Sequence, residues 1–191
     1  MLPFKNVERV NMTIVEPIRN LDKLKEVEQF LEKQNYRNLL LFSIGINSGL
    51  RISDILNLNV KDVKNKSYIQ LKEKKTHKFK KFPLNSKLKK MISKYTEGKS
   101  IDEPLFLTVF NNRMDRVYAY KIITSACKSV NIEENIGTHT LRKTFGYHFY
   151  KKFKDIAMLQ KILNHSSPEI TLRYIGIEQE EIYKNYKNFI L

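Results

Sequence analysis

Cysteine, long apolar runs and acidic residues are all scarce in this sequence, and each scarcity excludes a class of protein. Cys127 is the only cysteine among 191 residues, so neither an intrachain disulfide nor a cysteine-based zinc site can form. The longest apolar run, LLLFSIGI, is too short to cross a bilayer. The first residues, MLPFKNVERVN, lack the basic-then-apolar pattern of a signal peptide. These absences predict a soluble cytoplasmic protein without a membrane partner.

The shortage of acidic residues leaves the chain strongly basic. It contains 35 Lys and Arg against 20 Asp and Glu, which gives a formal net charge of +15. A charge of this size predicts a polyanionic partner, and nucleic acid is the leading candidate. Ribosomal and membrane-surface proteins can be equally basic, so charge alone does not decide between them.

Several familiar catalytic patterns are also missing from the sequence. It contains no phosphate-binding P-loop, no clustered carboxylates that would hold a metal ion, and no Ser-His-Asp arrangement. We therefore expect neither a nucleotide nor a metal cofactor.

The apolar periodicity predicts one domain, mainly α-helical, preceded by an arm. Residues 1–20 contain Pro3 and Pro17 and read as an extended N-terminal arm, and residues 21–191 form the expected domain. Helices are expected from Leu21, over residues 36–47 with Gly49 as the C-cap, from Ser53 and Asp54, over residues 85–97 and 115–131, and from Thr140 onward with breaks near Asp155, residues 164–168 and Gly176.

Between about Val60 and Leu84 the pattern becomes typical of strands. A basic stretch separates Tyr68, Ile69 and Leu71 from the next apolar residues. We expect a small antiparallel sheet here with a lysine-rich hairpin, which gives a mainly α fold with one small β-sheet.

Six polar residues stand in ordered local motifs across the last two thirds of the chain. They are Arg51 in SGLRISD, Lys75 in KKTHK, His139 and Arg142 in THTLRK, His165 in LNHSS, and Tyr174 in TLRYIG. Together they supply a nucleophile, two guanidinium groups, hydrogen-bond donors and a proton source. That set is what cleavage of a DNA phosphodiester without a metal requires.

Three segments resemble the motifs of one known family, the tyrosine recombinases or phage integrases. SGLRISDILNL resembles the first arginine block, HTLRKTFG the His-x-x-Arg block, and LNHSSPEITLRYIG the final block, with nine residues from His165 to Tyr174. The resemblance covers roughly residues 20–185 and implies the helical tyrosine recombinase catalytic domain. It further implies site-specific recombination of double-stranded DNA through a 3′-phosphotyrosyl intermediate. Most relatives carry a separate N-terminal DNA-binding domain, so this chain resembles a short form that lacks it.

The resemblance also assigns roles that agree with the chemistry of the residues. Arg51 and Arg142 would clamp the phosphate, because a guanidinium group presents paired donors and keeps its charge. Tyr174 would be the nucleophile, and His139 and His165 would donate to the phosphate or relay a proton. Asp54 would orient a neighbouring side chain. Helix capping is the simplest explanation for three hydroxyl residues of the final block, Ser166, Ser167 and Thr171.

The basic hairpin would supply the proton for the leaving 5′-oxygen. Residues 72–81 hold six lysines against one glutamate, and in the family the catalytic lysine precedes a Pro-Leu pair. Lys75 fits that register, while Lys74 is its competitor, because a one-residue slip would exchange the two faces of the strand. The other hairpin lysines are expected to bind DNA phosphates, with Lys74 counted among them if Lys75 is the acid: Lys72, Lys74, Lys78, Lys80 and Lys81.

The C-terminal segment carries Ile182, Tyr186, Phe189 and Ile190 at helical spacing. It can pack on its own domain or dock on a neighbouring protomer, and the family favours exchange within a homotetramer assembled on two DNA sites. Two other functions stay open at this point. One is a DNA-binding regulator that does not exchange strands, and the other is a topoisomerase-like nicking and closing enzyme.

Overall fold

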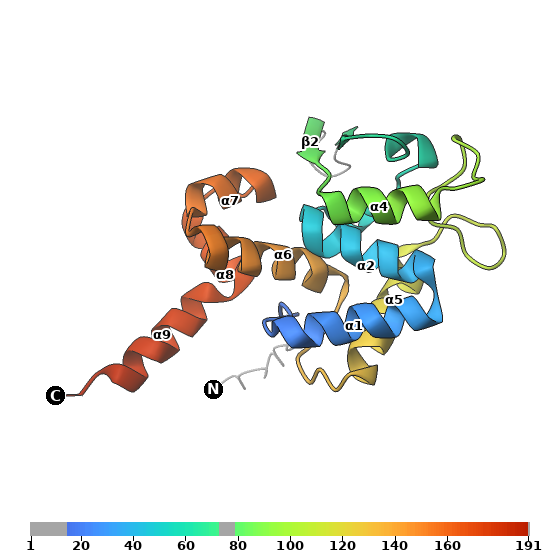
Figure 1. Cartoon of the computed structure of the whole chain (residues 1–191). Helices are drawn as coiled ribbons and strands as arrows, with labels where there is room; N and C mark the ends of the chain where they lie inside the picture. The colour runs from blue at the N-terminus through green and yellow to red at the C-terminus, as the bar shows by residue number, and fades with distance from the viewer. Residues whose placement is uncertain (1–14, 73–78, 191) are drawn as a thin grey trace, which may run out of the picture.

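The computed structural model describes residues 15–72 and 79–190, and its elements are mostly helices (Figure 1). In chain order they are α1 (Leu21–Gln34), α2 (Tyr36–Ser48), α3 (Ile52–Leu56), the 3-10 turn η1 (Val60–Asp62), β1 (Tyr68–Lys72), β2 (Phe79–Pro83), α4 (Ser86–Tyr95), α5 (Arg116–Ser129), α6 (Thr138–Phe153), α7 (Ile156–Leu163), α8 (Pro168–Ile175) and α9 (Ile177–Asn188). This order confirms the predicted fold class, mainly α with one small sheet.

Local sequence signals explain where the first two helices begin and end. The side chain of Asn20 caps α1 by accepting from the backbone N–H groups of Asp22 and Lys23, and Asn35 caps α2 in the same way. Gly49 ends α2 in the left-handed conformation at φ 64°, as predicted. A Cβ at this position would lie 2.5 Å from the ring of Phe145, so the turn requires glycine for space as well as for φ.

The sheet is a single antiparallel pair, and its register runs from Tyr68 opposite Pro83 to Lys72 opposite Phe79. The prediction placed β-structure from about Val60, which was eight residues too early. Residues Val60–Asp62 form the 3-10 turn instead, because Asn59 and Asp62 cap each other's backbone N–H groups in a capping box. Val60 is fully buried, so its apolar character reflects core packing rather than a strand.

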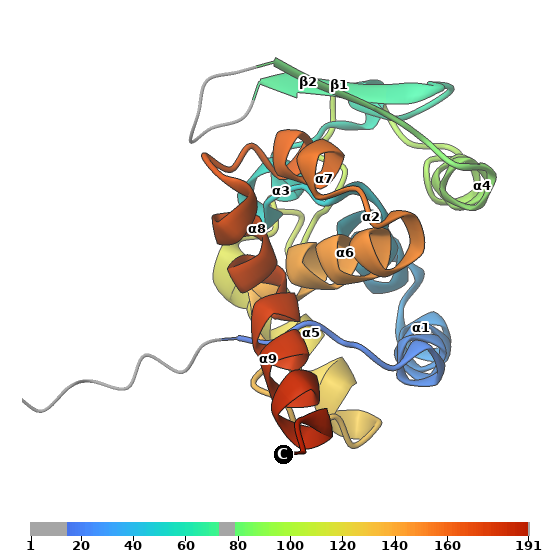
Figure 2. The same ribbon diagram turned by 90° about the vertical axis from the view of Figure 1, so that its left-hand side faces the viewer.

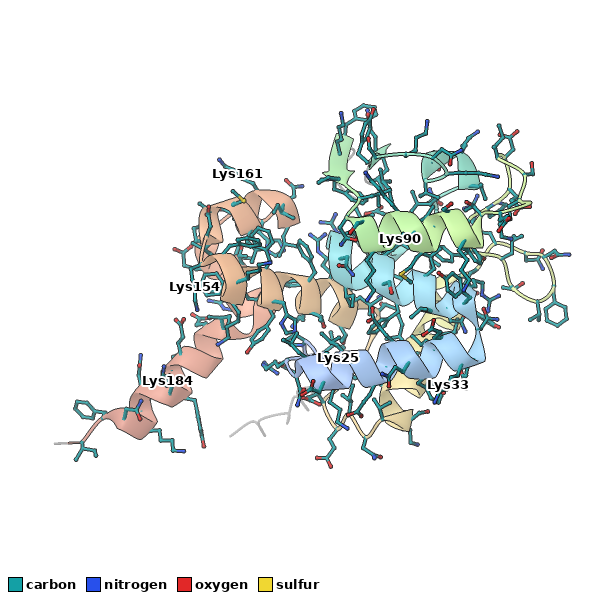
Figure 3. All side chains as sticks on the ribbon, viewed as in Figure 1. Lys25, Lys33, Lys90, Lys154, Lys161 and Lys184 are labelled. Carbon is teal, nitrogen blue, oxygen red and sulfur yellow. The ribbon has the colours of Figure 1, made fainter. Side chains whose placement is uncertain are left out.

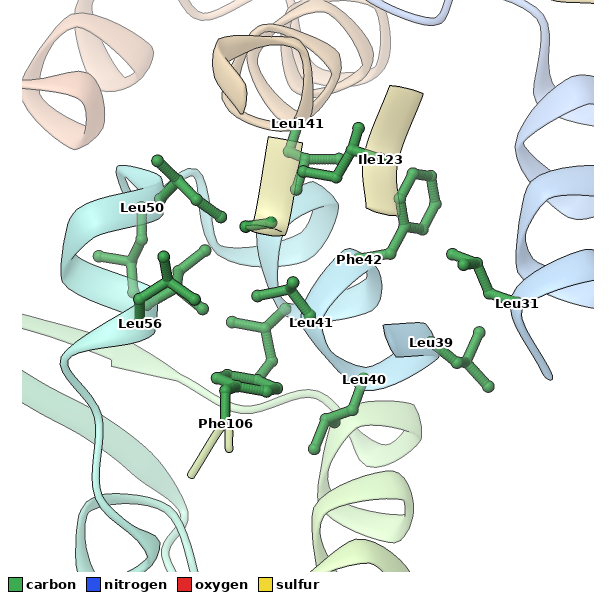
Figure 4. Packing of buried hydrophobic residues seen from close by; sticks show 14 of the residues in the cluster. Leu31, Leu39, Leu40, Leu41, Phe42, Leu50, Leu56, Phe106, Ile123 and Leu141 are labelled. Carbon is green, nitrogen blue, oxygen red and sulfur yellow. The ribbon is translucent and has the colours of Figure 1, made fainter. Parts of the chain in front are cut away.

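Buried apolar side chains form two separate clusters. The larger one centres on α2, whose Leu40, Leu41 and Phe42 pack with Phe106 and Ile123 from distant parts of the chain (Figure 4). The smaller cluster joins α6, α7, α8 and the start of α9, and consists of Tyr147, Leu159, Leu163, Ile175 and Ile177. Each fully buried large side chain stabilises the fold by about 1.5–3 kcal/mol, so the larger cluster dominates stability.

The sheet and α9 lie at opposite ends of the molecule, with α6, α7 and α8 between them (Figure 2). Helix α9 leads away from the rest of the chain toward the C-terminus (Figure 1). Within the described residues, α9 packs on its own domain at the buried Ile177, while its later apolar residues are exposed. Ile182 is 45% exposed and Ile190 is 88% exposed. No helix within the described residues has the length and apolar character needed to cross a membrane.

Candidate active site

Arg51 occupies the N-cap position of α3, just after the left-handed turn at Gly49. The helix therefore begins at Ile52, one residue before the predicted start at Ser53 and Asp54. Leu50 and Ile52 on either side are only 2% and 6% exposed, which confirms that this backbone is anchored in the core. The anchored backbone fixes the origin of the Arg51 side chain at the rim of the domain.

Arg142 lies in α6 and is only 3% exposed. Its guanidinium group donates to the backbone carbonyl of Gly49 at the end of α2 and to the carbonyl of Leu163 at the end of α7. A buried charge is tolerated when it is fully hydrogen-bonded, and the planar fork can satisfy two fixed acceptors at once. Arg142 thus joins three helices as well as contributing charge.

Arg51 and Arg142 line the same hollow, which has a volume of about 350 Å³. The first residues of α5 and α6, Arg116 and Thr138, also line it, and the N-terminus of a helix favours an anion. The residues that line it are Arg51, Ile52, Ser53, Arg116, Thr138, His139 and Arg142. Three arginines therefore line the hollow, and they favour an anion such as a phosphate group.

His139 stands in the first turn of α6 with its Nδ1 atom 3.4 Å from the Oη atom of Tyr174. Partial burial lowers the pKa of His139 below its usual value, and the neighbouring charges of Arg116, Arg142, Lys143 and Arg51 lower it further. The lowered pKa favours the neutral form of His139. A neutral imidazole beside a phenol can accept its proton.

Tyr174 lies in α8 and is partly buried. Burial raises the pKa of its phenol, while the charge and hydrogen bond of Arg142, together with the charge of Arg51, act in the opposite direction. A phenol with a raised pKa attacks poorly unless a base takes its proton. The Tyr174 hydroxyl has such a base within reach in His139.

His165 packs against Tyr174, with ring centroids 4.9 Å apart in an edge-to-face arrangement. It follows Asn164, which ends α7 in the left-handed conformation at φ 53°, at one of the predicted helix breaks. The Nδ1 atom of His165 lies 3.1 Å from Thr171 Oγ1. Because the Thr171 hydroxyl donates to the carbonyl of Ser167, it accepts from His165, which places the proton of a neutral imidazole on Nδ1.

This bond corrects one prediction. Thr171 was expected to cap a helix, but it is fully buried inside α8 and orients His165. Ser167 alone of the three hydroxyl residues takes the N-cap position of α8, where it accepts from the N–H of Ile170. Asp54 is 3% exposed inside α3, at the base of the turn that carries Arg51.

The structure describes some of the hairpin lysines and not others. Lys75, Lys74 and Lys78 lie outside the described residues, so the assignment of the general acid stays a prediction. Lys72 and Lys80 belong to the paired strands. The Nζ atom of Lys81 lies 3.7 Å from the centre of the Tyr68 ring on the opposite strand, in a cation–π contact.

Two basic residues beside this site were missed from the sequence. Arg116 begins α5 and lines the hollow, and the only available signal was its place directly after the helix-capping Asp115. Lys143 is only 7% exposed, and its Nζ atom lies 5.2 Å from the centre of the Tyr174 ring. A charged residue directly after Arg142, on an otherwise well-buried stretch of α6, was the signal for Lys143.

Comparison with known proteins identifies the family. The phage integrase family model matches residues 20–181. The chain belongs to the phage integrase family. It is 52% identical over 179 residues to the probable integrase/recombinase YoeC of Bacillus subtilis, which covers 93% of this chain and 98% of YoeC. It is 30% identical over 161 residues to a tyrosine recombinase of Pseudothermotoga lettingae, of which it spans only 56%.

Solved structures show the same fold. The XerA recombinase superposes with a TM-score of 0.72 at 21% identity, covering 99% of this chain and 68% of XerA. XerH bound to its difH substrate before cleavage superposes with a TM-score of 0.66 at 24% identity, covering 81% of this chain and 49% of XerH. The chain thus spans nearly all of YoeC but about half the length of other relatives in the family.

Proposed function

We propose that this protein is a tyrosine-type site-specific DNA recombinase that cuts and rejoins DNA through a 3′-phosphotyrosyl intermediate. The observation that carries the proposal is the position of the Tyr174 hydroxyl. It lies 3.4 Å from His139, which lines the hollow together with Arg51 and Arg142. A nucleophile, a base and two phosphate-binding guanidinium groups therefore meet at one place.

In the proposed reaction, Tyr174 Oη attacks the scissile phosphorus while His139 takes the phenolic proton. The bond from phosphorus to the 5′-oxygen breaks, and that oxygen needs a proton as it leaves. Arg51 and Arg142 stabilise the charge that builds on the non-bridging oxygens, which is the main way a protein accelerates phosphoryl transfer. The phosphotyrosine bond retains the energy of the original diester, so rejoining needs no nucleotide.

Lys75 is our proposed general acid for the leaving 5′-oxygen. A lysine among other cations has a lowered pKa and can act as an acid near neutral pH. His165, oriented by Thr171, is proposed as a second donor to the phosphate. Both roles were expected from the sequence, and they stay proposals.

Double-stranded DNA is the proposed substrate, and the net charge of +15 supports it. Lysines lie on many elements of the structure, such as Lys33 on α1, Lys90 on α4, Lys161 on α7 and Lys184 on α9 (Figure 3). Lys72, Lys74, Lys78, Lys80 and Lys81 of the hairpin are proposed phosphate contacts. Two expectations from the sequence stay predictions. One is the division into an arm at residues 1–20 and a catalytic domain at residues 21–191, and the other is the cytoplasmic location.

The exposed apolar residues of α9 support assembly of several protomers on DNA. Tyr186 near the end of α9 and Phe189 and Ile190 just after it are 80%, 71% and 88% exposed, and the helix leads away from the rest of the chain. Exposed apolar side chains in a row are typical of an interaction surface. We propose that α9 docks on a neighbouring protomer in a homotetramer that brings two DNA sites together.

The test is covalent capture of DNA. A pool of nicked duplexes with a randomised segment is incubated with wild-type protein and with Tyr174→Phe, and adducts are separated on a denaturing gel. The wild type should form an adduct, whose sequence defines the target site for later work, and Tyr174→Phe should form none while still retarding DNA in a native gel. Undiminished adduct with Tyr174→Phe would overturn the assignment of the nucleophile.

The alternative functions differ in whether they form the adduct and in how many DNA sites they need. A DNA-binding regulator with this fold would retard DNA but form no adduct in either protein. A topoisomerase-like enzyme would form the adduct and relax supercoiled DNA with a single site, whereas a recombinase exchanges strands only between two sites.

A further inference from the structure

The segment before α1, residues 15–20, lies along the helix that carries Arg142, and we call it the strap. The backbone N–H of Ile18 donates to Thr144 Oγ1 at 2.9 Å, and His148 Nε2 donates to the carbonyl of Ile18, also at 2.9 Å. Both partners lie on one face of α6, four residues apart. The N–H of Glu16 donates to the carbonyl of Asn135 at 2.8 Å. These bonds fix the register of the strap on α6.

Two charged residues of the strap reach the end of the nucleophile helix. Glu16 and Arg19 form an ion pair with a distance of 2.7 Å between Oε2 and Nη2. A Cβ on Gly176 would lie 2.8 Å from Arg19 Nη2 and 3.6 Å from Glu16 Oε2, so this pair rests against the backbone of Gly176. Gly176 has φ +76° and ends α8 two residues after Tyr174. The strap therefore braces the junction of α8 and α9 from outside.

Lys143 holds the same tyrosine from inside the domain. Its buried Nζ atom lies 5.2 Å from the centre of the Tyr174 ring, a cation–π distance. Burial lowers the pKa of Lys143, Glu16 opposes that change, and Arg19 adds to it. Glu16 thus stabilises the ammonium form that the contact with the ring requires.

We propose that the strap and Lys143 are positioning elements for the nucleophile, which together hold Tyr174 in the geometry of attack. This inference rests on the proposed role of Tyr174. Neither Glu16 nor Lys143 contacts a reacting atom in this account, because Lys143 lies against the ring and Glu16 against the α8–α9 junction. Their loss should slow the chemical step without weakening DNA binding.

The experiment measures single-turnover cleavage at saturating DNA and, separately, the dissociation constant, with the duplex selected by adduct formation as the probe. We expect Lys143→Met to slow cleavage by about 10- to 100-fold and Glu16→Gln by about tenfold, since a misplacement near 1 Å can cost about 10²-fold. Lys143→Arg keeps the cation and should recover most of the rate. The dissociation constant should stay within about twofold of wild type in every variant.

A matched control is available in α1. Glu26 pairs with Lys23 at 2.8 Å across the same i to i+3 spacing as the Glu16–Arg19 pair, but remote from Tyr174. Glu26→Gln should therefore leave the cleavage rate unchanged. The double variant Glu16→Gln/Lys143→Met should lose less cleavage rate than the product of the two single losses, because both residues act on one tyrosine.

Three results would overturn the inference. They are cleavage at the wild-type rate in both Glu16→Gln and Lys143→Met, a loss confined to DNA affinity, or fully multiplicative effects in the double variant. Glu16 is partly exposed, so its variant stays informative even if Lys143→Met folds poorly. Failure here is distinct from failure of the proposed function, since that would appear as the absence of adduct in the wild type.

Discussion

The two hydrophobic clusters of this chain differ in size and in the part of the candidate site that each supports. Among the described residues, thirty buried side chains form the cluster around α2, whereas five form the cluster around α7 and α8. Arg51 is anchored between core residues of the first, and Tyr174 lies on the edge of the second. The proposed clamp residue Arg51 is therefore built on the larger cluster and the proposed nucleophile on the smaller one, which we expect to open at a lower free energy.

Arg142 is the link between these two regions, since it donates to carbonyls of both. This division suits an enzyme that must hold the phosphate still through cleavage and rejoining. The tyrosine, by contrast, must form a bond to that phosphate and release it again. Substitutions in either region test this difference.

The largest effect is expected from Arg142→Ala. Cleavage should fall by at least ~10²-fold because a donor to the transition state is lost. The free energy of unfolding should also fall, by about 1–3 kcal/mol for each carbonyl left without a donor, as measured by urea denaturation. Arg51→Ala should reduce cleavage to the same extent but should lower the free energy of unfolding much less. Equal destabilisation by the two variants would contradict the proposed division between the two clusters.

The hairpin carries the next largest expected effect. Lys75→Ala should slow cleavage of ordinary DNA by about 10²-fold or more, as expected for a lost general acid. A substrate with sulfur at the bridging 5′ position should largely rescue the variant, because a thiolate leaves without a proton. Lys74→Ala is the matched control and should show neither the defect nor the rescue. Rescue of Lys74→Ala instead would move the general acid by one residue.

The two clusters can be compared directly with one deletion in each. Leu41 and Leu159 are both fully buried. Within the ~2–5 kcal/mol typical of Leu→Ala in a core, Leu41→Ala should lie at the upper end and Leu159→Ala at the lower end, because Leu159 belongs to the smaller cluster. Native-state hydrogen exchange should show α8 opening at a lower free energy than α2. Equal exchange free energies for both helices would contradict the expected difference in stability between the two clusters.

The smallest expected effect concerns the pH dependence of cleavage. His139 must be neutral to accept the proton of Tyr174, so the rate should fall as the pH drops through the lowered pKa of His139. Arg116→Ala removes one of the charges that lower this pKa. The loss of rate should therefore begin at a higher pH in the variant, while Lys121→Ala on the same helix should behave as wild type. An unchanged profile in Arg116→Ala would exclude His139 as the base.

Much of this fold followed from local signals in the sequence. Apolar spacing, the left-handed turns at Gly49 and Asn164, and the cap at Ser167 are each determined by a few neighbouring residues. The prediction of β-structure from Val60 was wrong because burial in the core and burial in a strand select the same apolar residue types.

The candidate site was less predictable, because its contacts join residues that are far apart in sequence. Arg142 donates to a carbonyl 93 residues away, and no local pattern encodes a backbone acceptor. Thr171 resembled a cap until its distance to His165 was known. Lys143 stands inside the THTLRK motif, but its contact with Tyr174 depends on the packing of α6 against α8, and no motif marked the strap.

The most direct test of the central claim is to identify the residue that becomes attached to DNA. The adduct formed by the wild-type protein on a nicked duplex is digested with protease and nuclease, and the peptide that keeps a nucleotide is sequenced by mass spectrometry. The account predicts a single modified residue, Tyr174, joined to a 3′-phosphate. Attachment at Tyr183 or Tyr186, or through a 5′-phosphate, would contradict it.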